Sequence, residues 1–341
     1  MNVFLFAYSE KGCKLALKIA ELFENSTLFS GEKFAKFHGV TPVKSTVLKA
    51  REVFDVSDLM VFVGACGIAV RSVAPCIKSK TSDPAVVVVD DMGNFVVSLL
   101  SGHIGMANDY CKFIANSINA VPVITTATDV NGKFSVDSFA VKNGLVISSM
   151  QKAMEFSAEI LNENLPISYG KEVICQENLP NGLVKHKENH IGVYLGFENK
   201  NPYKNTLHLV PKVLSVGIGC KRDISKQAIQ TLFDKVLNEY NLNENAVKGI
   251  FSIDLKKNEK ALLDFCDEHN FNATFYTKEE LLKAKGEFTS SNFVKTVTGV
   301  ECVCERSAIL GLNAGKILVK KTSLNGVTVA VAFEEINIKF D

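Results

Sequence analysis

The sequence lacks three features that would place it in a specialised class of protein: an excess of one charge, a long apolar run and a signal peptide. Its 38 Lys and Arg residues nearly balance its 37 Asp and Glu residues, which leaves a net charge of +1. Without a basic stripe, no electrostatic argument favours a nucleic acid partner. No apolar segment is long enough to span a bilayer, and the opening MNVFLFAYSEKG has no basic region ahead of an apolar run. We therefore expect a cytoplasmic protein that binds neither nucleic acid nor a membrane.

The sequence also lacks the ligand spacing of a metal site. It contains nine cysteines, but no Cys-x-x-Cys motif, and the closest pair, Cys302 and Cys304, is predicted to lie on one face of a strand. His186 and His190 are four residues apart, but the residues between them do not indicate a stable helix. We expect reduced thiols and no metal bound by the protein. The absence of G-x-G-x-x-G and G-x-S-x-G excludes a dinucleotide fingerprint and a serine-hydrolase elbow.

What is present is the pattern of a multi-part α/β protein. Of the 341 residues, 47% are hydrophobic and 22% are charged, which is enough for a substantial core. Apolar β-branched runs such as Leu59–Val63 and Ala85–Val89 alternate with helical patterns, as in a parallel sheet covered on both faces. The pattern weakens in the middle and restarts in the last third. The predicted fold class is α/β, with a mainly parallel-sheet N-terminal domain (residues 1–145), a small variable middle region (146–211) and an α/β C-terminal domain (212–341).

In open parallel sheets, ligands bind outside the carboxyl ends of the strands, so the polar segments there are candidate sites. The predicted strand Leu59–Val63 is followed by Gly64, Gly67 and Arg71. The glycines permit a tight turn and a close approach of the backbone to a ligand, and the arginine suits a carboxylate. A tight turn with a surface arginine explains the same residues.

A second polar segment precedes the strand Ala85–Val89 and contains Lys80 and Asp83. Asp83 stands directly before a proline, which is a common loop device, so a structural interpretation of this residue is favoured. Lys80 can lie at the rim of a site for an acidic ligand.

The segment richest in reactive groups is Ser101-Gly102-His103, at the end of a predicted strand and the start of a helix predicted over residues 104–118, which includes Asn108. Histidine can act as an acid or a base near neutral pH. Ser101 can be a helix cap, a substrate ligand or, less readily, a nucleophile.

A fourth segment, Thr125-Thr126-Ala127-Thr128-Asp129, follows the strand predicted over residues 121–124. Its hydroxyl and carboxyl groups offer many hydrogen bonds to a ligand. A capped turn explains Asp129 about as well as binding does.

The last third opens with a strand predicted to carry Gly217 and Gly219, followed by Cys220 and Lys221. This again places glycines and a cation at the end of a strand. Cys220 as a nucleophile is a weak hypothesis, because a small buried thiol is the usual role of such a residue.

Taken together and in this order, these segments resemble the family of the cobalamin biosynthesis protein CbiG. The runs that carry the resemblance to its N-terminal domain are GACGIAVR (64–71), AP (74–75), KTSDPAV (80–86), LLSGH (99–103) with Gly105 and Ala107-Asn108, and VITTATD (123–129). VGIGC (216–220) and SIDLK (252–256) resemble its C-terminal domain, so the resemblance covers nearly the whole chain. Met106 departs from the pattern Gly-His-x-Gly-Gly, where a second glycine is expected.

The resemblance implies an enzyme that acts on cobalt-precorrin-5A, a tetrapyrrole with many carboxylate arms. Such an enzyme opens the δ-lactone between the ring A acetate and C20, and then releases C20 with its methyl group as acetaldehyde, giving cobalt-precorrin-5B. The cobalt belongs to the substrate, so no cofactor is expected. We expect His103 to transfer protons, with Asp129 as an alternative base or an orienting partner and Ser101 as a further catalytic candidate. The expected substrate-binding residues are Gly64, Gly67, Arg71, Lys80, Asp83, Gly102, Asn108, Thr125, Thr126, Thr128, Gly217, Gly219 and Lys221.

Two other functions compete with this interpretation. A non-catalytic carrier that passes corrinoid intermediates to other enzymes of the pathway would use the same cationic loops. A methyltransferase that uses S-adenosylmethionine is disfavoured, because no Gly-rich first turn is followed by an acidic ribose ligand. The sequence makes no prediction of the oligomeric state.

Overall fold

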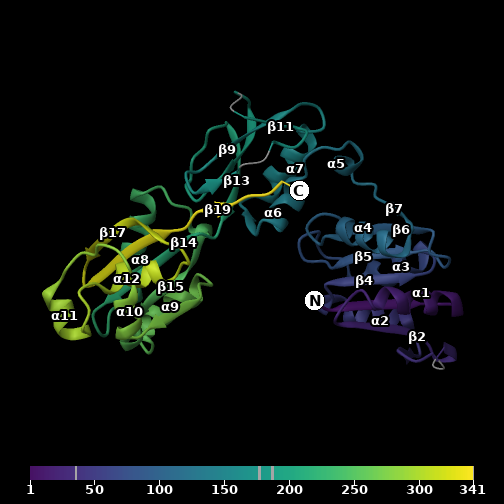
Figure 1. Cartoon of the computed structure of the whole chain (residues 1–341), viewed down its shortest axis with the longest axis horizontal. Helices are drawn as coiled ribbons and strands as arrows, with labels where there is room; N and C mark the ends of the chain where they lie inside the picture. The colour runs from purple at the N-terminus through teal and green to yellow at the C-terminus, as the bar shows by residue number, and fades with distance from the viewer. Residues whose placement is uncertain (35–36, 176–177, 186–187, 341) are drawn as a thin grey trace. The chain divides into compact units, whose positions relative to one another are not determined.

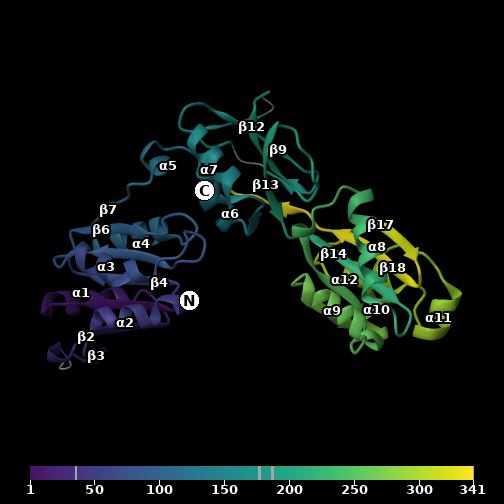
Figure 2. The same cartoon turned by 180° about the vertical axis from the view of Figure 1, so that it is seen from behind.

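The computed structural model describes residues 1–34, 37–175, 178–185 and 188–340, so that His186 lies outside the described residues. The chain forms two compact units, Met1–Ser138 and Phe139–Asp341. Each consists of sheets with helices packed on them (Figure 1, Figure 2), which confirms the predicted α/β class. The division into residues 1–145, 146–211 and 212–341 stays a prediction. No helix in the described part of the chain is both long and apolar enough to cross a membrane.

The first unit is built on one seven-stranded sheet with the order β3-β2-β1-β4-β5-β6-β7. The run AVVVV of β5 is buried on both faces, as expected for a central strand between two layers of helices. All neighbouring strands are parallel except β5 and β6. The strands are β1 (Val3–Ala7), β2 (Ser26–Gly31), β3 (Val40–Val43), β4 (Leu59–Val63), β5 (Ala85–Val89), β6 (Phe95–Leu100) and β7 (Val121–Val123).

Helices cover both faces of this sheet. The core beneath α1 (Glu10–Ala20) and α4 (Ala107–Ile118) contains Leu5 and Val61, which alternate with residues that face the other layer. The core beneath α2 (Thr46–Val53) and α3 (Cys66–Val73) contains Phe6 and Phe62. The helix α1 begins at a Ser9 cap, whose side chain accepts a hydrogen bond from the backbone N–H of Gly12. The short helix α5 (Ala127–Val130) follows β7.

The second unit begins with a five-stranded sheet of order β11-β9-β12-β13-β8, in the region where the sequence pattern is weak. Only β8 runs antiparallel to its neighbour. The helix α6 spans Val136–Lys142 and α7 spans Met150–Glu159. The strands are β8 (Leu145–Ile147), β9 (Leu165–Tyr169), β11 (Leu183–Lys185), β12 (Ile191–Leu195) and β13 (Asn205–Pro211).

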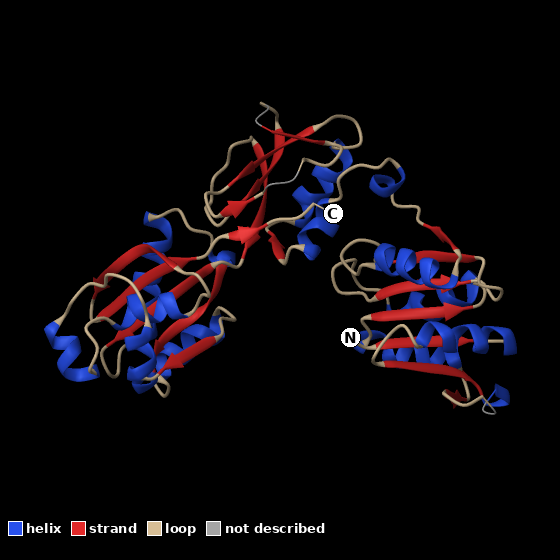
Figure 3. Ribbon diagram, in the orientation of Figure 1, coloured by secondary structure: helices blue, strands red, loops and turns tan. Residues whose placement is uncertain are grey.

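A second five-stranded sheet, of order β16-β15-β14-β18-β17, completes this unit. One face packs on α8 (Lys226–Glu239) and α9 (Lys260–Glu268), and the other on α12 (Val303–Leu310). Figure 3 shows these helices around the sheet. The strands are β14 (Leu214–Cys220), β15 (Val247–Ile253), β16 (Ala273–Tyr276), β17 (Lys316–Leu324) and β18 (Val327–Phe333), and the remaining helices are α10 (Lys278–Lys283) and α11 (Asn292–Thr298).

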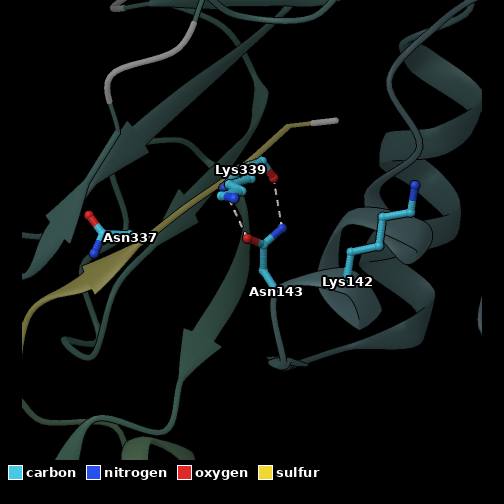
Figure 4. A pocket seen from close by; sticks show the side chains of 4 residues that line it. All are labelled: Lys142, Asn143, Asn337 and Lys339. Carbon is cyan, nitrogen blue, oxygen red and sulfur yellow. Dashed lines mark hydrogen bonds between the residues drawn. The ribbon is translucent and has the colours of Figure 1, made fainter. Parts of the chain in front are cut away.

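The end of the chain returns to the middle of the second unit. The strand β19 (Ile336–Asn337) pairs with β10 (Val173–Ile174). The Nδ2 atom of Asn143 donates a hydrogen bond to the carbonyl oxygen of Lys339 at 2.9 Å, and its Oδ1 atom accepts one from the backbone N–H of Lys339 at 3.1 Å (Figure 4). Both residues line a cavity of about 430 Å³. This pairing ties the C-terminal segment to the α6–β8 connection.

One sequence prediction about local structure is wrong. Cys302 and Cys304 do not lie on a strand, because Cys302 is the N-cap residue of α12 and Cys304 lies in its first turn. Both side chains are buried, and their sulfur atoms lie 3.8 Å apart. The three residues Cys302-Val303-Cys304 are too short a pattern to distinguish the start of a helix from a strand.

Candidate active site

The direction of β6 decides which polar segments meet. Because β6 runs antiparallel to β5, its carboxyl end lies beside the start of β5, where Leu100 pairs with Val86. The strand β7 is parallel to β6, so the segments that follow β6 and β7 leave the sheet at the same edge. His103 and Asp129 therefore meet at the edge where β1, β4 and β5 begin.

The connection from β6 to α4 is a tight loop. The backbone N–H groups of Ala107 and Asn108 donate to the carbonyls of Ser101 and Gly102, at 3.1 Å and 3.0 Å. The helix therefore begins at Ala107, later than the residue 104 that the sequence predicts, and His103 lies in the loop before it.

Two non-glycine residues in this loop have left-handed backbones: Ser101, with φ of 58°, and Met106, with φ of 64°. Glycine adopts this conformation without steric cost, which explains why glycine suits the position of Met106. The hydroxyl of Ser101 is buried and has no hydrogen-bond partner among the described residues. Backbone strain and an unsatisfied polar atom in one residue are typical of functional positions.

His103 and Asp129 form the centre of a hydrogen-bonded cluster. The Nε2 atom of His103 lies 3.0 Å from Oδ2 of Asp129 and 3.4 Å from the hydroxyl of Thr128. Asp129 Oδ2 also accepts hydrogen bonds from Asn108 Nδ2 at 3.0 Å and from the Thr126 hydroxyl at 2.9 Å. The side chains of His103 and Asp129 are 19% and 22% exposed, so a substrate can reach them while water is partly excluded.

The charges and hydrogen bonds of the cluster give Asp129 and His103 different roles in proton transfer. The hydrogen bond from His103 holds the pKa of the Asp129 carboxyl far below its ordinary value, and Thr126 and Lys112 lower it further, against the effect of burial. Asp129 is therefore ionised at neutral pH and is a weak base. An ionised carboxylate only accepts hydrogen bonds, so Nε2 of His103 carries the hydrogen in this pair and Nδ1 is the nitrogen that can take a proton.

Sequence reasoning missed Lys112, whose Nζ lies 3.3 Å from Asp129 Oδ1. Lys112 stands one helical turn after Asn108 on α4, and both side chains reach the same carboxylate. The spacing of four residues on a helix that begins at the polar loop was the signal that could have found it. Its side chain is 52% exposed, so the cluster presents a cation to solvent.

The other residues predicted at this edge have mixed placements. Gly102 is required by packing, because a Cβ there would stand 2.8 Å from Asn108 Oδ1. Thr125 is exposed beside the cluster. The buried carboxyl of Asp83 accepts hydrogen bonds from the backbone of its own loop, which supports the structural interpretation. Lys80 precedes β5 at this edge and lies 3.4 Å from Asp137 Oδ2.

Gly64, Gly67 and Arg71 are not brought to this cluster. They follow β4, whose carboxyl end lies at the opposite edge of the sheet from the carboxyl end of β6. At that edge the Arg71 guanidinium lies over Gly67, and one of its nitrogens is 3.4 Å from the position that a Cβ on Gly67 would take. The two edges are separated by the length of β4 and β5, so their residues do not form one local constellation. Substrate binding by these three residues stays a prediction.

Gly217, Gly219 and Lys221 belong to the second unit, where packing accounts for the glycines. A Cβ on Gly217 would stand 1.8 Å from the carbonyl oxygen of Cys304, and one on Gly219 would stand 2.7 Å from Thr328 Oγ1. Lys221 donates its backbone N–H to Gly326 in the β17–β18 turn. Burial raises the pKa of the Cys220 thiol to about 11, which argues against a thiolate nucleophile at neutral pH.

The groups that meet in the first unit are suited to proton transfer and anion binding. Among the described residues, no group of three or more His, Cys, Asp or Glu side chains is placed to hold a metal ion. A basic imidazole nitrogen, a carboxylate that fixes the ring and an exposed ammonium group suit general acid–base catalysis on an anionic substrate.

Comparison of the sequence with models of known protein families places the chain in the class of cobalamin synthesis proteins. Residues 49–129 match the family model "Cobalamin synthesis G N-terminal", and residues 214–332 match "Cobalamin synthesis G C-terminus". The first match contains the whole His103–Asp129 cluster.

Two relatives of known name then show to which family the chain belongs. The cobalt-precorrin-5A hydrolase of Priestia megaterium is 31% identical, with 96% of this chain and 93% of the relative covered. The enzyme of the same name from Salmonella typhimurium is 32% identical, with 97% of each chain covered. The chain belongs to the CbiG family of cobalt-precorrin-5A hydrolases, as the resemblance implied.

Proposed function

We propose that this protein is a cobalt-precorrin-5A hydrolase that opens the δ-lactone of its substrate and releases C20 as acetaldehyde, giving cobalt-precorrin-5B. The observation that carries the proposal is the His103–Asp129 pair with its 3.0 Å contact, in a partly buried cluster at a sheet edge of a family member. The cobalt ion is part of the substrate.

In the first step, Nδ1 of His103 takes a proton from water as the oxygen attacks the lactone carbonyl. Asp129 keeps the ring oriented and stabilises the imidazolium ion that forms, as a buried carboxylate does for a catalytic histidine. The tetrahedral oxyanion needs a hydrogen-bond donor, and the Ser101 hydroxyl, which has no partner among the described residues, is suited to that role. As the intermediate collapses, the acyl C–O bond breaks and the imidazolium of His103 returns its proton to the C20 oxygen. The new carboxyl group loses its proton to solvent, which leaves a carboxylate on ring A and a hydroxyl on C20.

In the second step, a base removes the proton from the C20 hydroxyl. The electron pair left on the oxygen forms the second C–O bond of acetaldehyde, the bond from C20 to the macrocycle breaks, and the electron pair of that bond moves into the macrocycle. His103, again neutral, is the group in the cluster that can accept this proton. Lys112 and Lys80 lie at the same edge, and their ammonium groups are suited to pair with carboxylate arms of the substrate.

The proposal is tested by incubating purified protein with cobalt-precorrin-5A in water enriched in ¹⁸O. The expected result is one acetaldehyde for each substrate consumed and one ¹⁸O atom in the ring A carboxylate, because water attacks the acyl carbon. The carrier hypothesis predicts that the substrate binds and that no acetaldehyde forms.

A further inference from the structure

The two members of the His103–Asp129 pair come from separate connections of the first sheet. His103 lies in the loop between β6 and α4, and Asp129 lies in α5, after β7. The ladder of hydrogen bonds between β6 and β7 ends at Val97 and Val123, before either connection begins. The sheet therefore does not fix the 3.0 Å contact between His103 Nε2 and Asp129 Oδ2, and other contacts must hold the two side chains in place.

Asn108, in the first turn of α4, contacts both connections. Its backbone N–H donates to the carbonyl of Gly102, the residue before His103, at 3.0 Å. Its side-chain Nδ2 donates to Asp129 Oδ2 at 3.0 Å and to Thr126 Oγ1 at 2.9 Å. The side chain also packs on Gly102, where a Cβ would stand 2.8 Å from Asn108 Oδ1. A single residue thus links the backbone before His103 to the carboxylate that His103 contacts.

The directions of these hydrogen bonds allow the Asn108 amide only one orientation. The Thr126 hydroxyl has one hydrogen, which it donates to Asp129 Oδ2 at 2.9 Å, so it accepts the hydrogen bond from Asn108. The ionised carboxylate of Asp129 also only accepts. Both partners therefore require the NH2 group of the amide and use its two hydrogens. A flipped amide would turn its oxygen toward two acceptors.

The other end of the amide is buried and unsatisfied. Asn108 is 3% exposed, and its Oδ1 atom has no hydrogen-bond partner among the described residues. A buried carbonyl without a partner is destabilising, and such a group in a folded protein calls for an explanation. The observed orientation satisfies the Asp129 carboxylate and leaves the amide oxygen unsatisfied. This burial also keeps the amide away from a ligand that approaches from solvent.

We propose that Asn108 is a positioning residue, whose amide holds the Asp129 carboxylate so that Oδ2 accepts the ring hydrogen of His103 and leaves Nδ1 to take a proton. Its part in catalysis rests on the proposed function, but its effect on the His103 ring is a property of the protein without substrate. Lys112 is the other charged group on this carboxylate, and it reaches Oδ1 from the next turn of α4. The sequence interpretation made Asn108 a substrate-binding residue, which is the alternative that the test must separate.

The test compares two changes of Asn108 with the same changes of Asn116, an exposed residue about two turns later on the same helix. Asn108→Ala removes both side-chain donors, and Asn108→Asp places a second carboxylate against Asp129 with little change of size. Asn116→Ala and Asn116→Asp repeat each change away from the site. The ring state is read without substrate by ¹⁵N NMR of protein labelled in its six histidines, and the loss of a signal in His103→Asn assigns His103.

In the wild type, the neutral His103 ring should carry its hydrogen on Nε2. Asn108→Ala should add a detectable population with the hydrogen on Nδ1, because the carboxylate loses a donor that fixes its orientation. With cobalt-precorrin-5A, kcat should fall at least about tenfold, as expected for lost hydrogen bonds to a charged group. KM should stay within about twofold, because the amide contacts Asp129 and not the substrate. Asn116→Ala should leave the ring state, kcat and KM at their wild-type values.

Asn108→Asp should change the pH dependence of the reaction, which a purely structural role would not. A second carboxylate at this position adds negative charge near His103 and favours the protonated imidazole. Since the base must be unprotonated to act, the pH at half-maximal kcat should rise by roughly one unit or more. Asn116→Asp adds the same charge to α4 away from the pair and should leave this pH unchanged.

Two outcomes would overturn the positioning role. A folded Asn108→Ala variant that keeps the wild-type ring state and kcat would show that the amide does not act on the pair. A rise in KM at constant kcat would make Asn108 a substrate-binding residue instead. If the wild type releases no acetaldehyde but Asn108→Ala still redistributes the ring hydrogen of His103, the positioning of the ring stands and the enzyme function fails.

A second variant keeps the proposal testable if Asn108→Ala does not fold, as judged by thermal unfolding. Thr126→Val removes the hydroxyl that accepts from Asn108 and donates to Asp129 Oδ2. It should lower kcat in the same direction with KM within about twofold, and it should add the Nδ1–H form of the His103 ring. An unchanged ring state together with an unchanged kcat in this variant would overturn the proposal.

Discussion

Replacing Asp129 by asparagine tests the arrangement of the site at its centre. The substitution keeps the size of the side chain but removes the charge that four groups contact: His103, Thr126, Asn108 and Lys112. An asparagine amide can donate to Nε2 of His103, which would place the ring hydrogen on Nδ1 and remove the base. We expect the rate of acetaldehyde formation to fall at least about 100-fold, the lower end of the contribution of a general base.

The same substitution should reduce stability in a pH-dependent way. Losing hydrogen bonds to a charged group should cost roughly 2 kcal/mol in the free energy of unfolding at neutral pH. Because the pKa of Asp129 is lowered in the folded protein, its stabilising effect is fully present above the unfolded pKa of about 3.9 and is lost as the pH falls below it. The difference between wild type and Asp129→Asn should therefore be constant from neutral pH down to about pH 5 and shrink below about pH 4.

The assays are single-turnover acetaldehyde formation and urea unfolding across this pH range. A variant that keeps near-normal rates would show that Asp129 does not orient the catalytic base. A stability difference that grows as the pH falls would contradict the assignment of an ionised carboxylate at this position.

Three further predictions concern the surroundings of the site and the second unit. Lys112→Gln should lower kcat/KM several-fold at low salt, with a smaller gap at high salt because screening weakens an exposed cation; an equal effect at all salt concentrations would contradict this. Met106→Gly relieves the left-handed backbone and should raise the free energy of unfolding by up to about 1 kcal/mol, as measured by urea unfolding; a loss of stability would contradict it. Gly217→Ala should lower the free energy of unfolding by about 1–3 kcal/mol, because its Cβ would meet the carbonyl of Cys304. Gly31→Ala is the control and should change stability little, because no atom lies within 4 Å of the new Cβ. Equal shifts of the melting temperature in the two variants would refute the packing argument.

The central strands were predictable from the sequence because their burial leaves a local pattern. Leu59–Val63 and Ala85–Val89 begin and end where the apolar runs do. The sheet of the middle region was harder to see, because strands such as β13 mix polar residues and a proline into a mostly buried run. Its pattern matches neither strict alternation nor a continuous apolar run.

The candidate site was only partly predictable, because strand direction is not a local property. The residues of the His103–Asp129 cluster were identified, but the sequence interpretation placed Arg71 at the same edge as His103. The connection Asp90–Asn94 between β5 and β6 is too short for a parallel crossover, which requires a dozen or more residues, so it already indicated an antiparallel pair. Lys112 was missed because its contact with Asp129, 17 residues later in the sequence, depends on how α4 packs beside the segment that follows β7.

The measurement that tests the account most directly is single-turnover acetaldehyde release from cobalt-precorrin-5A by the wild type and by His103→Asn. Asparagine keeps a hydrogen-bonding group beside Asp129 but cannot take a proton. If His103 is the catalytic base, the wild type releases stoichiometric acetaldehyde and the folded variant does so at a rate at least about 100-fold lower. Near-normal release by His103→Asn, or no release by the wild type despite substrate binding, would contradict it.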